Sequence, residues 1–316
     1  MCGSREGKVA YPLSRLHAEG IARTITTNFY LIYDSDMNPQ SLERLKQILD
    51  APEDEIDVAE AALLLAQEEY PKLDVSAYLR RLDEMAQAVR ETLPANAAAA
   101  EIIFSLNRYL FHEQGFDGDA ANYYDPRNCF INQVLERKVG IPITLSIIYM
   151  EIGQRLGLPL QGISFPGHFL VKLSVESGEI VLDPFSGGVS LGRDELEQQL
   201  AQTQGDKESA KIPLEEWLVT ATKKDMLVRV LHNLKGIYAH GGQLEKTLSV
   251  INRILLVAPE LAEEVRDRGL VYRQLECFRA ALTDLQTYLQ MEPESEDRDE
   301  IRDNVIDLQK IVARLN

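Results

Sequence analysis

The stretch GIPITLSIIYMEIGQRLGLP (140–159) decides the fold, because it leads into GHFLVKL (167–173) and VLDPF (181–185). Its Gly-Ile-Pro start is a sharp break, and the apolar residues that follow predict a buried helix over 143–157 that ends at a glycine. The two later stretches have the length and apolar content of strands. We expect a helix packed against a small antiparallel sheet, and therefore an α+β fold.

Three short strands are expected in this sheet, at 160–165, 168–175 and 179–185. Ser177-Gly178 joins the last two as a hairpin turn, which brings His168 and Asp183 onto neighbouring strands. A carboxylate beside an imidazole can fix its tautomer and raise its basicity. The structural alternatives are a strand histidine paired only for stability and an aspartate that forms a turn before proline.

A nucleophile at the N-terminus of the 143–157 helix would complete a catalytic triad, since a helix N-terminus lowers the pKa of a thiol. The sequence has Pro142 there, and proline carries no nucleophile. The remaining candidates are Thr144 and Ser146, one turn inside the helix, and Cys129 upstream. Ser146 also fits a packed hydroxyl bonded to a backbone carbonyl, and Cys129 fits a semi-buried inert thiol.

The segments around this core are mostly helical. Four amphipathic helices are expected before it, at about 39–50, 54–70, 74–93 and 97–112. Asn38 and Pro39 supply the first helix with an N-cap and a first-turn proline. A polar loop at 115–130 and a helix at about 129–138 lead into the core, and a helix at about 192–203 follows it.

A 34-residue period appears after residue 219. The recurring pairs are Tyr238 and Tyr272, Leu248 and Leu282, and Pro259 and Pro293. Paired helices with this period and a closing proline are typical of tetratricopeptide repeats. The first copy is degenerate, with Lys235 where the second has Gly269 and Thr247 where the second has Ala281. A plain helical hairpin domain is the alternative.

These patterns divide the chain into four parts. They are a weakly structured arm (1–36), a helical N-terminal part of the core (37–115), the core itself (116–205) and the helical repeats (219–316). Within the arm, TTNFYLIYD (26–34) fits either a short strand or an apolar extension.

Charge and cysteine content limit the compartment and the partners. The net charge of −17 opposes general binding to nucleic acid or to a membrane surface, because both are polyanionic. Cys2, Cys129 and Cys277 are too few and too scattered for a disulfide framework or a zinc site. The sequence has neither a signal-peptide pattern nor an apolar run of membrane-spanning length. We therefore expect a cytoplasmic protein without a metal or another cofactor.

The core resembles the transglutaminase-like superfamily, a papain-like group with a Cys-His-Asp triad. Gly157-Leu158-Pro159 matches the end of the family's helix, His168 matches its histidine, and Asp183-Pro184 matches its aspartate. The position of the family's cysteine falls at or near Pro142.

A closer resemblance, to the bacterial SirB-type family, covers most of the chain. That family joins a transglutaminase-like core to C-terminal tetratricopeptide repeats, and it is matched by the block 123–188 and by the upstream run 57–86. Its members generally carry the proline version of the helix start. The resemblance implies a conserved scaffold without the standard thiol chemistry.

A second group of candidates is polar or aromatic and is expected to line a groove beside His168. These residues are Tyr124, Asp125, Arg127, Asn128, Asn132, Pro142 and Phe165. Asn128 is also a candidate helix cap, and an ion pair between Arg127 and Glu136 is a structural alternative.

The main functional hypothesis is a pseudoenzyme: a non-catalytic, regulatory scaffold that binds a protein or peptide through the core groove, the repeats or both. The alternative is an enzyme of altered chemistry, a hydrolase or acyl transferase, that uses His168 and Asp183 with Ser146, Thr144 or Cys129. A third hypothesis is an adaptor in which only the repeats bind. The missing thiol favours the first, and the retained His168–Asp183 pair favours the second.

Overall fold

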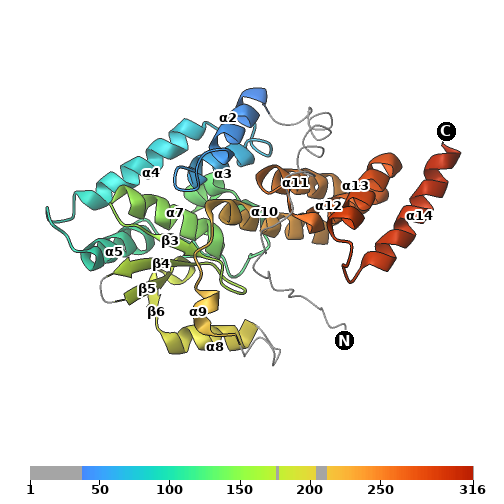
Figure 1. Cartoon of the computed structure of the whole chain (residues 1–316). Helices are drawn as coiled ribbons and strands as arrows, with labels where there is room; N and C mark the ends of the chain where they lie inside the picture. The colour runs from blue at the N-terminus through green and yellow to red at the C-terminus, as the bar shows by residue number, and fades with distance from the viewer. Residues whose placement is uncertain (1–37, 176–177, 204–211, 316) are drawn as a thin grey trace. The chain divides into compact units, whose positions relative to one another are not determined.

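A computed structural model describes residues 38–175, 178–203 and 212–315, which fall into two compact units. The first unit ends at Met226 and the second begins at Leu227, inside α10 (Lys223–His240). The expected arm at 1–36, with its apolar stretch at 26–34, and Ser177 of the expected hairpin turn lie outside the described residues. Figure 1 labels most of the described helices and the four strands β3 to β6.

Helices open the first unit, and short polar side chains set where they start. In α2 (Pro39–Leu49), the Asn38 side chain accepts a hydrogen bond from the backbone N–H of Gln40, as its N-cap pattern predicts. Asp57 caps α3 (Val58–Ala66) in the same way, by accepting a hydrogen bond from the backbone N–H of Glu60. The remaining elements of this helical part are α4 (Val75–Arg90), α5 (Ala99–Asn107) and the π-helix η1 (Arg108–Glu113).

A polar loop joins these helices to the core. It contains the short 3₁₀ turn η2 (Pro126–Cys129) and is followed by α6 (Ile131–Arg137). Two very short strands, β1 (Asp117–Gly118) and β2 (Val139–Gly140), pair in parallel. The sequence pattern did not predict this pair, because two residues are too few to show an alternation.

The core sheet has four antiparallel strands in the order β3-β4-β5-β6. They are β3 (Gln161–Ile163), β4 (Leu170–Val175), β5 (Gly178–Asp183) and β6 (Val189–Leu191). The helix α7 (Pro142–Arg155) contacts β3 and β4 as well as α3, α4 and α6. The α+β prediction is confirmed, with β6 as an addition.

The core is built around α7, whose residues are buried from Pro142 through Gly153. A helix that is apolar on all sides must be covered on all sides, which is why α7 has both helical and sheet neighbours. Tyr149 in α7 and Phe165 after β3 are among the largest fully buried side chains. Burial of such a side chain stabilises the fold by about 1.5–3 kcal/mol. After the sheet come α8 (Arg193–Thr203) and α9 (Leu214–Trp217).

The second unit continues α10 with α11 (Leu244–Val257), α12 (Ala262–Gln274), α13 (Phe278–Met291) and α14 (Arg298–Arg314). Close packing explains the small residues of the second repeat: a methyl group at Gly269 would stand 2.7 Å from a Leu285 side-chain carbon, and Ala281 is fully buried. At the position of Gly269 in the first repeat, Lys235 instead extends its ammonium to Glu264 and Asp267 of α12, at 2.7 Å each. A salt bridge between helices thus replaces a close helix contact in the degenerate copy.

Candidate functional site

The His168–Asp183 pair lies where the chain enters β4 and leaves β5. The register places Val171 opposite Leu182, so the residues just before β4 lie beside the end of β5. The Nε2 atom of His168 is 2.9 Å from Oδ1 of Asp183. His168 itself is in a tight turn, with its backbone N–H donating to the carbonyl of Phe165 at 3.0 Å. The prediction that His168 opens the strand is wrong by two residues, because this turn delays β4 until Leu170.

Asp183 is almost completely buried, at 2% exposure, and its carboxylate is well supplied with donors. The Ser186 hydroxyl donates to Oδ2 at 2.7 Å, and the Phe185 and Ser186 backbone N–H groups donate to Oδ1 at 3.0 and 3.3 Å. Burial alone would raise the pKa of Asp183, but His168 and these donors outweigh it and hold the pKa below its usual range. Asp183 is therefore both a turn-forming cap and an ionised partner for His168.

The His168 ring is held between Asp183 and Phe185 and is only partly exposed. Its side chain is 18% exposed, and its ring meets that of Phe185 edge-on, with 5.7 Å between centroids. The Nε2 atom is buried and lacks a hydrogen bond of regular geometry within the described residues, so its 2.9 Å contact with the Asp183 carboxylate is off-axis. Within the described ranges, no hydroxyl or thiol hydrogen bonds to the ring. In the described part of the chain, the arrangement is therefore an imidazole beside a buried carboxylate, with no nucleophilic side chain hydrogen-bonded to it.

The start of α7, where the superfamily pattern has its cysteine, carries a helix cap. Pro142 is the first residue of α7. The Thr144 hydroxyl accepts a hydrogen bond from the backbone N–H of Ile141 at 3.2 Å and donates to the carbonyl of Asn128 at 2.8 Å. Since Thr144 is fully buried, its hydroxyl is committed to closing the first turn of the helix.

The two other candidate nucleophiles are also enclosed. Ser146 is buried and donates to the carbonyl of Phe169 at 3.2 Å, which matches the carbonyl-bonded hydroxyl considered from sequence. Cys129 is buried, and burial raises the pKa of its thiol far above the ordinary value. A thiol in that state is not a ready nucleophile.

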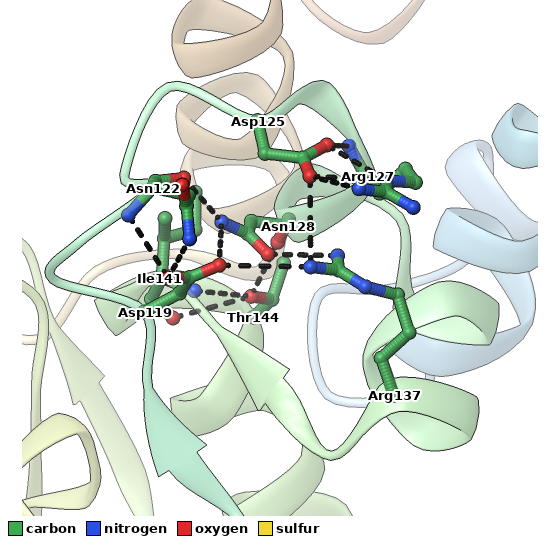
Figure 2. Close-up of polar contacts among 8 residues, drawn as sticks. All are labelled: Asp119, Asn122, Asp125, Arg127, Asn128, Arg137, Ile141 and Thr144. Carbon is green, nitrogen blue, oxygen red and sulfur yellow. Dashed lines mark hydrogen bonds and ion pairs between the residues drawn. The ribbon is translucent and has the colours of Figure 1, made fainter.

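A polar network fills the loop before α6. This loop cluster consists of Asp119, Asn122, Asp125, Arg127, Asn128 and Arg137, and Figure 2 shows it with Ile141 and Thr144. Asn128, at 0% exposure, is at its centre. Its amide donates to Asp119 at 3.1 Å and to the Asn122 carbonyl at 2.9 Å, and it accepts from Arg137 at 2.9 Å (Figure 2). All hydrogen-bonding groups of this buried amide are used.

The two arginines of the loop cluster neutralise its carboxylates. The Arg127 side chain donates to the Asp125 carboxylate from Nε at 3.0 Å and from Nη2 at 2.6 Å. These hydrogen bonds lower the pKa of Asp125. The alternative pair of Arg127 with Glu136 is wrong, because Glu136 lies 3.1 Å from Arg81 instead.

The residues expected to line one groove are divided between the interior and the surface. Phe165 is fully buried among core side chains such as Ile163 and Leu170. Asn132 is buried too, and its amide oxygen has no hydrogen-bond partner in the described part of the chain. By contrast, Tyr124 is 72% exposed.

Sequence reasoning missed the group that supports Asp183. Ser186 follows Asp183 by three residues, and this Asp-Pro-x-Ser spacing is typical of a capped turn, so the signal was present. Asn107 of α5, which reaches the same turn, and Tyr149 of α7, which bonds to Asn107, gave no local signal.

Comparison with known proteins places this chain in a family. Residues 76–232 match the transglutaminase-like superfamily, and residues 234–305 match the tetratricopeptide repeat. A UPF0162 protein of Xylella fastidiosa is 40% identical over 251 residues, which cover 78% of this chain and 88% of that protein. The chain belongs to the family of UPF0162 and SirB1 proteins.

Other relatives in this UPF0162/SirB1 family match a similar share of this chain. Protein SirB1 of Salmonella typhimurium is 30% identical over 245 residues, covering 76% of this chain and 88% of that protein. The UPF0162 protein YchA of Escherichia coli is 28% identical over 236 residues, covering 74% and 85%. The resemblance seen in the sequence is therefore confirmed. Across the described ranges, no helix combines the length and apolar character needed to cross a membrane.

Proposed function

We propose that this UPF0162/SirB1 family member is a non-catalytic, regulatory scaffold that binds a protein or peptide partner. The observation that carries the proposal is the start of α7, where Pro142 occupies the nucleophile position. The nearest hydroxyl, on Thr144, caps the helix by accepting a hydrogen bond from the Ile141 N–H and donating one to the Asn128 carbonyl. Without an attacking atom, covalent acyl transfer by the superfamily's route has no first step.

The C-terminal repeats support the binding part of the proposal. Tetratricopeptide repeats stack helix pairs into extended surfaces that commonly dock protein segments. The proposed scaffold has a helical part at 37–115, a core at 116–205 and repeats at 219–316. We place it in the cytoplasm, because its cysteine usage suits a reducing compartment.

The partner surface on the core is proposed to include His168 and Tyr124. A partner would be identified by cross-linking to the full-length chain in cells and then purified for titration calorimetry. We expect Tyr124→Ala and His168→Ala to weaken its binding by about tenfold or more. Phe104→Ala is the matched control, since Phe104 is an exposed aromatic side chain of the same unit, at 67%, outside the proposed surface.

Two results would count against this proposal. Equal affinity for wild type, Tyr124→Ala and His168→Ala would remove the core from the interface and leave the adaptor in which only the repeats bind. Release of ammonia from a glutamine peptide, or cleavage of a peptide, would instead indicate catalysis.

The second candidate function is an enzyme of altered chemistry, a hydrolase or acyl transferase. Its support is the ionised Asp183 behind His168, which is the arrangement of a general base. Loss of a measured turnover in Ser146→Ala, Thr144→Val or Cys129→Ala would identify the nucleophile. Loss in His168→Ala alone would indicate a base acting on water or on a nucleophile of the substrate.

A further inference from the structure

The side chain of Asn107, the last residue of α5, connects two elements of the core. Its amide oxygen accepts a hydrogen bond from the Tyr149 hydroxyl at 2.8 Å, and its amide nitrogen donates to the carbonyl of Gly188 at 2.9 Å. Tyr149 is fully buried in α7 and stacks on Phe111. The tyrosine therefore fixes which end of the amide faces Gly188, because a hydroxyl that donates here must meet the amide oxygen.

Gly188 closes the turn that follows Asp183. Its backbone N–H donates to the Asp183 carbonyl at 2.8 Å, and its φ of +75° lies in the left-handed region. A Cβ atom at this position would stand 2.4 Å from the Asn107 amide oxygen. Only glycine meets both requirements, the backbone angle and the close approach of Asn107.

The turn held in this way supplies the surroundings of the His168–Asp183 pair. It contains Phe185 and Ser186, whose N–H groups and hydroxyl donate to the Asp183 carboxylate. The Phe185 ring also meets His168. A change in this turn would therefore alter the position of the carboxylate and of the imidazole together.

The local helix geometry marks Asn107 as a special position. The α-helix changes into the π-helix η1 at Arg108, immediately after Asn107. Such wide turns shift the direction of the side chains around them and are frequent at functional sites.

We propose that Asn107 is the positioning residue of the His168–Asp183 pair and that it acts through Gly188, with Tyr149 orienting its amide. The hydrogen bonds run from Tyr149 to Asn107 and from Asn107 to Gly188, so the effect of Asn107 and Tyr149 on the imidazole passes through the turn. The inference requires only the geometry of the pair and holds whether the site binds a partner or catalyses a reaction.

Nuclear magnetic resonance tests the proposal on the full-length chain with ¹³C-carboxyl aspartate and ¹⁵N-imidazole labels. In the wild type, we expect the Asp183 carboxyl to titrate below the ordinary aspartate range and neutral His168 to occupy the Nε2–H tautomer. In Asn107→Ala, we expect the Asp183 titration to move up toward the ordinary range and the single His168 tautomer to be lost. Both changes follow if the donors in the turn no longer hold the carboxylate.

Two further variants keep the test decisive. Tyr149→Phe leaves every carbon in place and removes only the hydroxyl, so it should give the same signature at smaller amplitude, and it carries the test if Asn107→Ala fails to fold. Gln67→Ala is the matched control, because the Gln67 amide also donates to a backbone carbonyl, that of Leu73, at 2.9 Å. Unchanged Asp183 and His168 signals in both site variants would overturn the proposal, as would equal changes in Gln67→Ala.

Discussion

The loop cluster and the His168–Asp183 pair are both polar sites in the core, yet their hydrogen bonding differs. In the loop cluster, the central amide of Asn128 is fully buried and has its donors and acceptor paired with Asp119, the Asn122 carbonyl and Arg137. In the pair, Asp183 is satisfied in the same way, but the His168 side chain remains partly exposed, and its Nε2 atom has no regular hydrogen bond to any residue that the structure describes.

This difference separates a structural polar cluster from a candidate functional site. A buried network with every group paired stabilises one conformation and has no remaining capacity for a ligand. A side chain that is positioned but not fully paired keeps that capacity, which is how functional sites commonly depart from full satisfaction. From sequence, Asp125, Arg127 and Asn128 of the loop cluster were expected to line a groove beside His168, and the structure distinguishes the loop cluster from the pair by their hydrogen bonds.

The largest expected effect comes from the centre of the loop cluster. Asn128→Ala should lower the free energy of unfolding by about 3 kcal/mol, because it removes three hydrogen bonds, to Asp119, to the Asn122 carbonyl and from Arg137, at a fully buried position. Chemical denaturation measures this. Asn122→Ala is the control, since Asn122 is exposed and its side chain makes one long contact, at 3.3 Å. If both variants lost the same small amount of stability, the loop cluster would not be structural.

Asp183→Asn should destabilise the protein by about 2 kcal/mol at neutral pH, since it removes a charged acceptor. The pKa of Asp183 is lower in the folded state than in the unfolded state, so its contribution is present above the unfolded value, about 3.9. That contribution is lost as the pH falls through the folded pKa. The difference in unfolding free energy between wild type and Asp183→Asn should therefore shrink below about pH 4. A difference that stays constant down to pH 2 would contradict a lowered pKa.

Ser186→Ala should cost about 1 kcal/mol, because it removes one hydrogen bond to the Asp183 carboxylate and leaves the backbone donors in place. The pKa of Asp183 should rise by less than in Asn107→Ala, since the turn itself remains held. The same ¹³C titration measures both variants. A larger rise in Ser186→Ala would show that the hydroxyl, rather than the turn, controls the carboxylate.

The smallest effect is expected at Cys129. Its buried thiol should resist alkylation in the folded protein while the exposed Cys277 reacts, and peptide mass spectrometry can follow each site. Cys129→Ala should leave ammonia release from a glutamine peptide at background, as in the wild type. Rapid alkylation of Cys129 would show that the loop beside Asn128 opens readily, and the contrast between a closed cluster and an open pair would fail.

The sequence by itself determined the family, the α+β class and most of the elements. Short windows of sequence contain local periodicity and local hydrogen bonding. These signals are the apolar run of α7, the N-cap Asn38 and first-turn Pro39 of α2, and the 34-residue period. Where the signal was only composition, as with Phe165 and Asn132 in the expected groove, sequence could not separate buried from exposed positions.

Tertiary structure alone decided what surrounds the candidate site. Asn107, Tyr149 and Gly188 come from three elements, and their contact depends on how α5, α7 and the turn after β5 pack. The hydrogen bond from the Thr144 hydroxyl to the Asn128 carbonyl likewise joins a helix to a loop sixteen residues upstream. Hydrogen bonds act over about 3 Å in space, whatever the separation along the chain. The sequence therefore predicted His168 and Asp183 as a pair, and only the packed chain shows what holds them and which candidate nucleophiles are already engaged.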